Sequence, residues 1–425
     1  MLGLLEHSSL VGKDSSVHQA IRECCCRHAD SEGFKNVFRW FPWLKNMLSS
    51  PEKYYLAHGA SEVSKQQWLH HKHSLSAECI LINGKYEASL SQLPDGVLGM
   101  SLGEAQAVFS NLLRKYDVGD QPLAFFNAVC SHDFGVVLYV PEDMQMNETL
   151  CIRHVCFPLS HDDRVIYSPK IVVIVGKRAS CQIQISHHTE RSSGVMESFS
   201  VVNGVTEIFV SEEAEVMLTM SPKYIHEERV SWSHSVTVEE RGAYSVHYDL
   251  LADVHGVGWF DNNFSLVGDH AYGETLVSIL SPKQTWMRNQ MYHDAASTTS
   301  QQLIKSILYS GNFSFEGGIH ISSRGMFSDA HQKHDTLLLG DQASVTTFPR
   351  LEILTDDVKA SHGATVGPLD LQQIFYMRSR GMTYEEAQKK LVQGFLIMHP
   401  SLKFFPKLVA QQQQDENGRT SIDTM

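Results

Sequence analysis

Apolar and polar residues alternate over much of the middle of the chain. From about residue 125 onward, short apolar runs recur and are separated by turn-forming residues, as in VVLYVPEDM, LCIRHVCF, KIVVIVG, CQIQIS and EVMLTM. A period of two places successive side chains on opposite faces, which is typical of β-strands. The pattern therefore predicts a region built mainly of short strands.

Several of these strands begin next to a small residue, which suggests a repeat. The alanines concerned are spaced 35, 29, 28 and 72 residues apart, and they are Ala179, Ala214, Ala243, Ala271 and Ala343. We interpret each as the corner of a coil, with more than one coil in the longest interval. Stacked coils bury their inward residues against each other, so a β-solenoid fits the pattern, and a large β-sandwich is the alternative.

The pattern becomes helical after the strands. Leu371, Ile374 and Phe375 have helical spacing, and Gly381 stands where a helix ends. Thr383-Tyr384-Glu385-Glu386 is a capping box that predicts the start of a second helix. The two helices form a hairpin with an apolar face that is free to bind a partner, made of Leu371, Ile374, Leu391 and Phe395.

The chain therefore divides into four parts. Residues 1–120 are a mixed, mostly helical region, with helices predicted at 16–28, 62–73 and 101–116 and a strand–turn–strand unit at 81–96. The β core covers residues 121–367, and a helical partner-binding domain covers 368–405. The polar tail, 406–425, is predicted to be disordered.

Composition and the motifs that are missing from the sequence argue against several classes of function. A net charge of −13 over 425 residues argues against a general nucleic-acid binder. The chain shows neither a secretory signal nor an apolar run long enough to cross a membrane, so we expect a soluble, cytoplasmic protein. Eight cysteines without a CxxC pair indicate reduced thiols rather than a structural zinc site. Neither a P-loop nor a G-x-S-x-G motif is present, and no catalytic residue is predicted.

A single histidine, His362, lies in a strand-like segment of small residues. The apolar face changes phase between Ile353 and Val358, which predicts a β-bulge near Asp356-Asp357. His362 then shares a face with Val358 and Ala360. Two interpretations remain open: an inert core or interface histidine, or a metal ligand completed by residues from elsewhere.

Other histidine clusters are weaker candidates for a metal site. His331 and His334 are three residues apart, a spacing that suits one helical or turn face. The adjacent pair His187-His188 points to opposite faces of a strand and does not easily share one metal. The group at 70–73 is interpreted as a solvated helix face.

Motifs around His362 resemble a known family. Asp356-Asp357-Val358-Lys359, the run 361–367 (SHGATVG) and the run 375–381 (FYMRSRG) are similar to the C-terminal signature of the SufB/SufD family of iron–sulfur cluster assembly proteins, and to its SufD branch most closely. Upstream, the runs 315–319 (FEGGI) and 329–332 (DAHQ) resemble its central motifs. The resemblance covers roughly residues 80 to 400.

The resemblance implies a fold and a role. The fold is a right-handed parallel β-helix, a β-solenoid, flanked by helical segments. The role is that of a non-catalytic scaffold subunit in a SufBCD-type complex for iron acquisition and cluster assembly. Such a subunit pairs with SufB through the last β-helix strands and docks the SufC ATPase through the C-terminal helices.

The resemblance also implies site residues. His362 matches a proposed cluster or iron ligand at the SufB interface. Ala360 stands where family members often carry cysteine, so any thiolate ligands must come from SufB. No cofactor is expected to bind this chain tightly by itself; a transient iron–sulfur cluster forms in the complex, and a flavin is a further candidate. The predicted partner-binding residues are Leu371, Ile374, Phe375, Tyr376, Arg378, Arg380, Leu391 and Phe395.

An enzyme is the alternative, because many β-solenoids are polysaccharide lyases or hydrolases. Such an enzyme needs clustered carboxylates on one face of the solenoid. Asp253, Asp261 and Asp269 are spaced by eight residues and are the candidates for that cluster.

Overall fold

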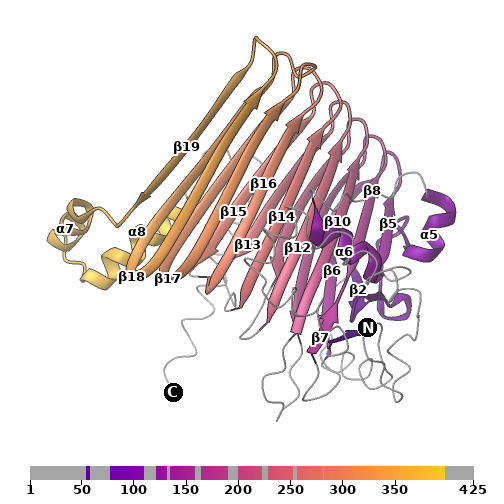
Figure 1. Cartoon of the computed structure of the whole chain (residues 1–425), viewed down its shortest axis with the longest axis horizontal. Coiled ribbons are helices and arrows are strands. Elements are labelled where there is room, and N and C mark those ends of the chain that lie inside the picture. The colour runs from indigo at the N-terminus through magenta and orange to yellow at the C-terminus, as the bar shows by residue number, and fades with distance from the viewer. Residues whose placement is uncertain are drawn as a thin grey trace.

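The structure is a computed structural model that describes residues 54–57, 77–109, 121–131, 135–157, 164–189, 200–222, 228–251, 256–280 and 282–397. The predicted helices at 16–28 and 62–73, the histidine group at 70–73 and the tail at 406–425 lie outside these ranges. Strands make up 63% of the described residues and form a β-solenoid of about six turns (Figure 1). The predicted solenoid is therefore confirmed, and the β-sandwich is not.

Two parallel stacks of strands form the walls of the solenoid. The first sheet contains β2 (Glu78–Ile82), β6 (Gln145–Cys156), β9 (Ser180–Thr189), β11 (Glu215–Pro222), β13 (Ala243–Leu250), β15 (Tyr272–Leu280), the first parts of β17 (Thr299–Ile321) and β18 (Asp329–Ile353), and β19 (Lys359–Gly367). The second contains β5 (Val136–Val140), β8 (Lys170–Val175), β10 (Ser200–Val210), β12 (Arg229–Val238), β14 (Val257–Leu266), β16 (Gln284–His293) and the second parts of β17 and β18. Because β17 and β18 run through both stacks, all 19 strands are linked.

Antiparallel strands and helices cover the N-terminal end of the solenoid. β3 (Lys85–Tyr86) pairs antiparallel with β2, and β4 (Leu98–Ser101) pairs antiparallel with β5. The short helix η2 (Ala88–Leu90) follows β3, α5 (Leu102–Phe109) follows β4, and α6 (Pro122–Ser131) contacts β10. β1 (Tyr54–Ala57) pairs with β7 (Arg164–Tyr167), which in turn pairs with β10. Among the described strands, β2 at Glu78–Ile82 already belongs to the first stack.

Each coil turns a corner through one residue in the left-handed region. These residues have φ between 52° and 63°, lie 27 to 35 residues apart, and are Asp143, Arg178, Glu213, Arg241, His270, Ser297, Phe327 and Asp357. At each of the first seven corners the backbone N–H of this residue donates to a carbonyl in the next coil, as from Arg241 to Asp269 at 2.9 Å. The corners therefore stack in register, and each coil depends on the following one for its hydrogen bonds.

The predicted corners are partly right. Ala179, Ala214 and Ala271 directly follow the left-handed residue and are buried. Ala243 comes one residue later than this position, because Gly242 follows Arg241. The prediction was wrong for Ala343, which lies within β18, and the interval before it contains the corners at Ser297 and Phe327.

The predicted bulge near Asp356-Asp357 is also wrong. Asp357 is the left-handed residue of the last corner, between β18 and β19. The apolar phase slips there because the chain passes from one sheet to the other, and a corner has no fixed period.

The C-terminal hairpin has the predicted local structure. α7 (Leu371–Ser379) begins at the side-chain cap of Asp370 and is followed by Gly381 with φ of 95°. α8 (Tyr384–Ile397) begins with the capping box: the backbone N–H of Thr383 donates to Glu386 Oε2 at 2.8 Å, and the N–H of Glu386 donates to Thr383 Oγ1 at 3.2 Å. Among the described residues, none of the helices is long and apolar enough to cross a membrane.

The left-handed corners predict the effect of one substitution. His270 is exposed and has φ of 62°. We expect His270→Val to lower the free energy of unfolding by about 1–2 kcal/mol, because a β-branched side chain clashes with its backbone in this region. His270→Gly should stay within about 1 kcal/mol of the wild type, because glycine adopts positive φ freely but loses more entropy on folding. Urea unfolding monitored by circular dichroism measures both variants, and an equal loss in both would contradict the corner assignment.

Candidate functional site

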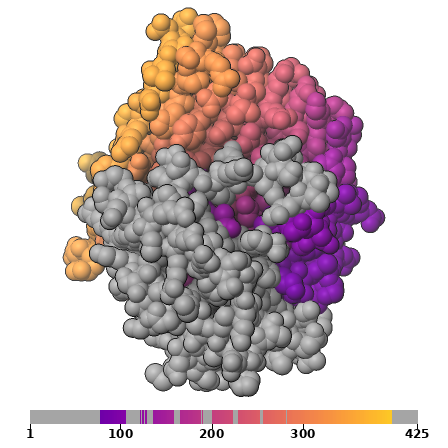
Figure 2. Space-filling model, turned by 45° about the vertical axis from the view of Figure 1, so that its right-hand side comes forward, coloured from indigo at the N-terminus to yellow at the C-terminus, as the bar shows by residue number. Residues whose placement is uncertain are grey.

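The C-terminal end of the solenoid is open. Within the described chain, β19 pairs only with β18, and the second part of β18 pairs only with β17, so two strand edges face outward (Figure 1). Four large apolar side chains are exposed at this end: Phe348 (56%), Ile353 (40%), Leu354 (65%) and Val366 (44%). Figure 2 shows this end and the N-terminal coils on opposite sides of the molecule.

His362 stands on the open edge, on the inward face of its coil. In the strand register it lies over Gln332, which lies over Gln302, which lies over Thr275. Thr275, Gln302 and Gln332 are buried, whereas His362 is exposed because the next coil is absent. Its neighbour Ala360 packs on the end of the core, as the predicted face requires. His362 is thus the last of a series of inward-facing side chains, one from each coil, that stack in register. We call such a series an inward column, and this one becomes polar toward the open end.

The side-chain amide of Gln332 is buried directly beneath His362. Both its Oε1 and its Nε2 lack a hydrogen-bond partner among the described residues. Gly317 makes room for it, since a Cβ at this position would lie 2.4 Å from the amide atoms. Buried amides normally have partners. The open end therefore contains polar groups suited to contact something outside this chain.

His334 occupies the neighbouring inward column and is closed off. Its ring nitrogens lie 3.2 Å from Ser306 Oγ, 3.1 Å from Thr336 Oγ1 and 3.1 Å from Thr347 Oγ1. Burial lowers the pKa of His334 to about 4. His331 is exposed on the outer face, with Nδ1 2.6 Å from Ser361 Oγ. The prediction that His331 and His334 share a face was wrong, because the segment is a strand.

The C-terminal hairpin presents only part of its predicted face. Leu371, Phe375 and Tyr376 are 73%, 74% and 60% exposed, and Arg378 and Arg380 are exposed as well. Ile374, in contrast, is buried and belongs to the hairpin's own contact.

The second helix connects the hairpin to the solenoid. The ring of Phe395 lies 4.3 Å from Nζ of Lys305 in β17, a cation–π contact. Leu391 is half-buried and lines a shallow open hollow of about 400 Å³ with Asp370, Gln372, Gln373, Tyr376 and Met377. The exposed face thus differs from the predicted one: Leu371, Phe375 and Tyr376 are available, and Phe395 is directed at β17.

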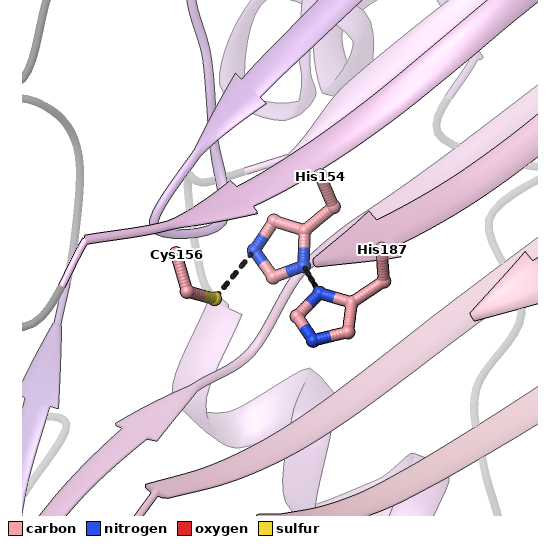
Figure 3. Close-up of side chains that lie close together, drawn as sticks. All are labelled: His154, Cys156 and His187. Carbon is pink, nitrogen blue, oxygen red and sulfur yellow. Dashed lines mark hydrogen bonds between the residues drawn. The ribbon is translucent and has the colours of Figure 1, made fainter. Parts of the chain in front are cut away.

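A buried cluster that the sequence analysis missed lies near the N-terminal end of the first sheet. Figure 3 shows His154 and Cys156 on β6 beside His187 on β9. His154 Nδ1 lies 3.0 Å from His187 Nδ1, and His154 Nε2 lies 3.6 Å from Cys156 Sγ. Burial and the charge of Glu228 raise the pKa of the Cys156 thiol well above its usual value. Part of this cluster could be recognised from the sequence, because His154 and Cys156 are two residues apart and share a face of their strand. The sequence did not show that His187, in the next coil, pairs with His154.

The other described cysteines are Cys79, Cys151 and Cys181. Cys79 and Cys181 are buried, Cys151 is half-buried, and none of the described cysteines forms a disulfide.

Comparison with known proteins bears directly on this fold. Residues 158–395 match the family model for the SufBD core domain of the SUF system for FeS cluster assembly. This match covers more than half of the chain and includes every coil from β7 onward together with α7 and most of α8. The chain belongs to the SufB/SufD family.

Three relatives show how far the similarity extends. The chain is 41% identical over 113 residues to the iron–sulfur cluster assembly protein SufD of Escherichia coli, covering 26% of each protein. It is 27% identical over 320 residues to the chloroplastic protein ABCI7 of Arabidopsis thaliana, covering 72% of this chain and 65% of the relative. It is 24% identical over 306 residues to a SufBD family protein of Pyrococcus horikoshii, covering 70% and 64%. The chain thus matches less than two thirds of the length of each.

Two of the three carboxylates proposed for a polysaccharide enzyme are described by the structure, and each has its own partner within the fold. Asp261 is buried on β14 and accepts from Arg288 Nε at 2.8 Å and Nη2 at 2.9 Å. Asp269 lies in a corner, where it accepts from the backbone of Ala296. Asp253 lies outside the described residues. The SufB/SufD family membership and this geometry disfavour the enzyme alternative.

His334 predicts a pH dependence of stability. Its pKa is about 4 in the folded chain and about 6.5 in an unfolded chain, so the unfolded state binds the extra proton between these values. The stabilisation is complete above pH 6.5 and is lost as the pH falls toward 4, at about 1.4 kcal/mol per pH unit. His334→Gln should therefore lose less stability than the wild type between pH 7 and pH 5 in urea unfolding. Replacement of the exposed His270 by Gln should retain the wild-type slope. An unchanged slope in His334→Gln would contradict the assignment.

Proposed function

We propose that this chain is a non-catalytic scaffold subunit of a SufBCD-type complex, in which it helps to acquire iron and assemble an iron–sulfur cluster. The observation that carries the proposal is the pair of unpaired strand edges at the C-terminal end. An exposed edge of a parallel sheet presents unpaired N–H and C=O groups that another strand satisfies. Repeat proteins also need a polar terminal coil for solubility, and this end has exposed apolar side chains instead.

The partner at this edge is proposed to be a SufB-like subunit. A chain of the same fold offers an equivalent last coil, so two such chains can join their open ends about a local twofold axis. That contact would continue both sheets from one solenoid into the other. It would also cover Phe348, Leu354 and Val366 and provide partners for the buried amide of Gln332.

His362 is proposed as an accessory ligand for iron or the nascent cluster at this junction. Its imidazole is exposed on the inward face of the edge, where it would meet side chains of the partner. The described cysteines are remote from this edge in the register, since Cys79, Cys151, Cys156 and Cys181 belong to β2, β6 and β9. Thiolates, which suit iron and its clusters, would therefore come from the partner.

The C-terminal hairpin is proposed as the docking site for a SufC-like ATPase. Leu371 and Phe375 are spaced i, i+4 and form one exposed apolar stripe on α7. An exposed stripe of this kind fits a groove on a partner. The contact between Lys305 and Phe395 connects the hairpin to β17, so a partner on α7 and α8 would be linked to the last coils.

The edge can be tested by one charged substitution. We expect Phe348→Asp to weaken binding of the SufB-like chain by about tenfold or more, because a buried carboxylate in an apolar contact is costly. Leu98→Asp is the matched control, since Leu98 is 53% exposed on β4 at the opposite end. Co-purification and titration of the two chains measure the effect, and equal binding by both variants would refute the edge contact.

The hairpin can be tested in the same way. Phe375→Asp should lower the affinity for the SufC-like ATPase by about tenfold or more, for the same reason. Its fold should persist, because the side chain is 74% exposed. Leu98→Asp again serves as control, and unchanged co-elution of the ATPase with Phe375→Asp would remove the docking role.

The role of His362 is tested on the reconstituted complex. His362→Ala should reduce the iron and sulfide retained per complex while the two chains still co-purify. His331→Gln, an exposed imidazole on the outer face of the same end, is the control and should retain wild-type loading. Normal loading in His362→Ala would mean that this histidine only packs the interface.

A further inference from the structure

The buried cluster of His154, Cys156 and His187 lies far from the open end, and the proposed scaffold role does not use it. One ligating atom from each of these residues lies within 4.8 Å of the others, and all three side chains are buried. Within the described chain, no other group of three or more histidine, cysteine or acidic side chains comes together in this way. We propose that this cluster is a binding site for a zinc-type divalent cation.

The register of the solenoid builds the site. His154 and His187 are paired across β6 and β9, so their side chains stack in adjacent coils, with ring centroids 4.9 Å apart. Cys156 is two residues beyond His154 and therefore points to the same side of β6. The three ligands thus come from two rigid strands rather than from a loop, which favours a fixed geometry.

A carboxylate orients the second imidazole. Glu228 Oε1 lies 3.4 Å from His187 Nε2 and accepts from Thr189 Oγ1 at 2.5 Å. When His187 Nε2 carries the proton toward Glu228, its Nδ1 is left with a lone pair facing His154. A carboxylate on the outer nitrogen of a ligating histidine is the usual arrangement in zinc sites.

The same contacts define the protons of the three side chains in the absence of a cation. His154 Nδ1–H then donates to His187 Nδ1, and His154 Nε2 accepts from the Cys156 thiol. A cation that binds Cys156 Sγ and His154 Nε2 replaces only the thiol proton, which is released. The thiolate and the Glu228 carboxylate together balance the two positive charges of the ion.

The distances suit a tetrahedral ion. Zinc bonds of about 2.3 Å to sulfur and 2.0–2.1 Å to nitrogen place a sulfur and a nitrogen ligand about 3.6 Å apart. Cys156 Sγ and His154 Nε2 are 3.6 Å apart. A ring nitrogen of His187 lies within 4.8 Å of the other two ligating atoms, and His187 completes the third position by a ring movement that releases its hydrogen bond to His154. Glu228 stays on His187 Nε2, and the fourth position remains for water. The thiolate and imidazole donors favour zinc over magnesium or calcium, which prefer oxygen ligands.

Cobalt substitution in the full-length chain tests the site. The purified, metal-free protein is titrated with Co²⁺, and thiolate-to-cobalt charge-transfer absorption is recorded. We expect one equivalent to bind with this absorption and Zn²⁺ to displace it. Failure of the wild type to bind one equivalent with thiolate absorption would overturn the proposal.

Variants identify the ligands. Cys156→Ser should abolish the charge-transfer band, and Cys181→Ser, at another buried cysteine of the first sheet, should retain it. Glu228→Gln should keep the band but weaken binding by about 10–100-fold. His187→Gln should weaken binding more strongly than Glu228→Gln. It tests the site independently if circular dichroism shows that Cys156→Ser is unfolded. A wild-type affinity in His187→Gln, or a wild-type band in Cys156→Ser, would overturn the site.

Discussion

The stacking of one coil on the next is the constraint on which the whole structure depends. In a parallel solenoid, each strand satisfies its backbone groups with neighbours in the coils before and after it, and each corner donates to the following corner. A coil therefore cannot be complete by itself. At the N-terminal end, β3 and β4 run antiparallel to the stack and occupy the edges of β2 and β5. At the other end, no described strand does this for β19, so the requirement for a neighbour persists at the surface of the molecule. The exposed apolar residues and the unpaired amide of Gln332 lie where that requirement is unmet.

The interior of the solenoid is not uniform, and its variation separates two sites. One inward column passes from Leu218 and Val246 through Thr275 to Gln302 and Gln332, so it becomes polar only toward the open end. The buried histidine and cysteine cluster belongs to the first coils instead, where Glu228 and Thr189 lie beside it. Polar groups inside a solenoid are costly unless they are paired. A further buried polar network, which includes His234, Tyr248 and Asn262, lies in the middle coils and is paired within the chain. The amide of Gln332 at the open end differs from it, because it has no hydrogen-bond partner among the described residues.

Much of this architecture could be predicted from the sequence, because local chemistry decides it. The capping box at Thr383, the turn at Asn83-Gly84 and the buried alanines of three corners all depend on residues close together in the chain. The errors arise where a feature depends on contacts between residues that are far apart in the sequence. Ala343 resembles a corner but lies in a long strand, and only the register against β17 shows this. His187 was set aside because its sequence neighbour points elsewhere, whereas its true neighbour is His154, one coil away. The first two coils are longer than the coils from Glu213 onward, so regular spacing could not align the two positions.

The difference between the two ends of the solenoid has a consequence for assembly size. A stack of parallel coils with two open ends could grow without limit, adding copies head to tail into a filament. Here one terminus of the stack is closed by strands of reversed direction, and one is open. A contact between two open ends would use up both, and among the described strands nothing would remain to template a third subunit. Under that proposal, the direction of two short strands near the start of the stack would limit polymerisation to a pair.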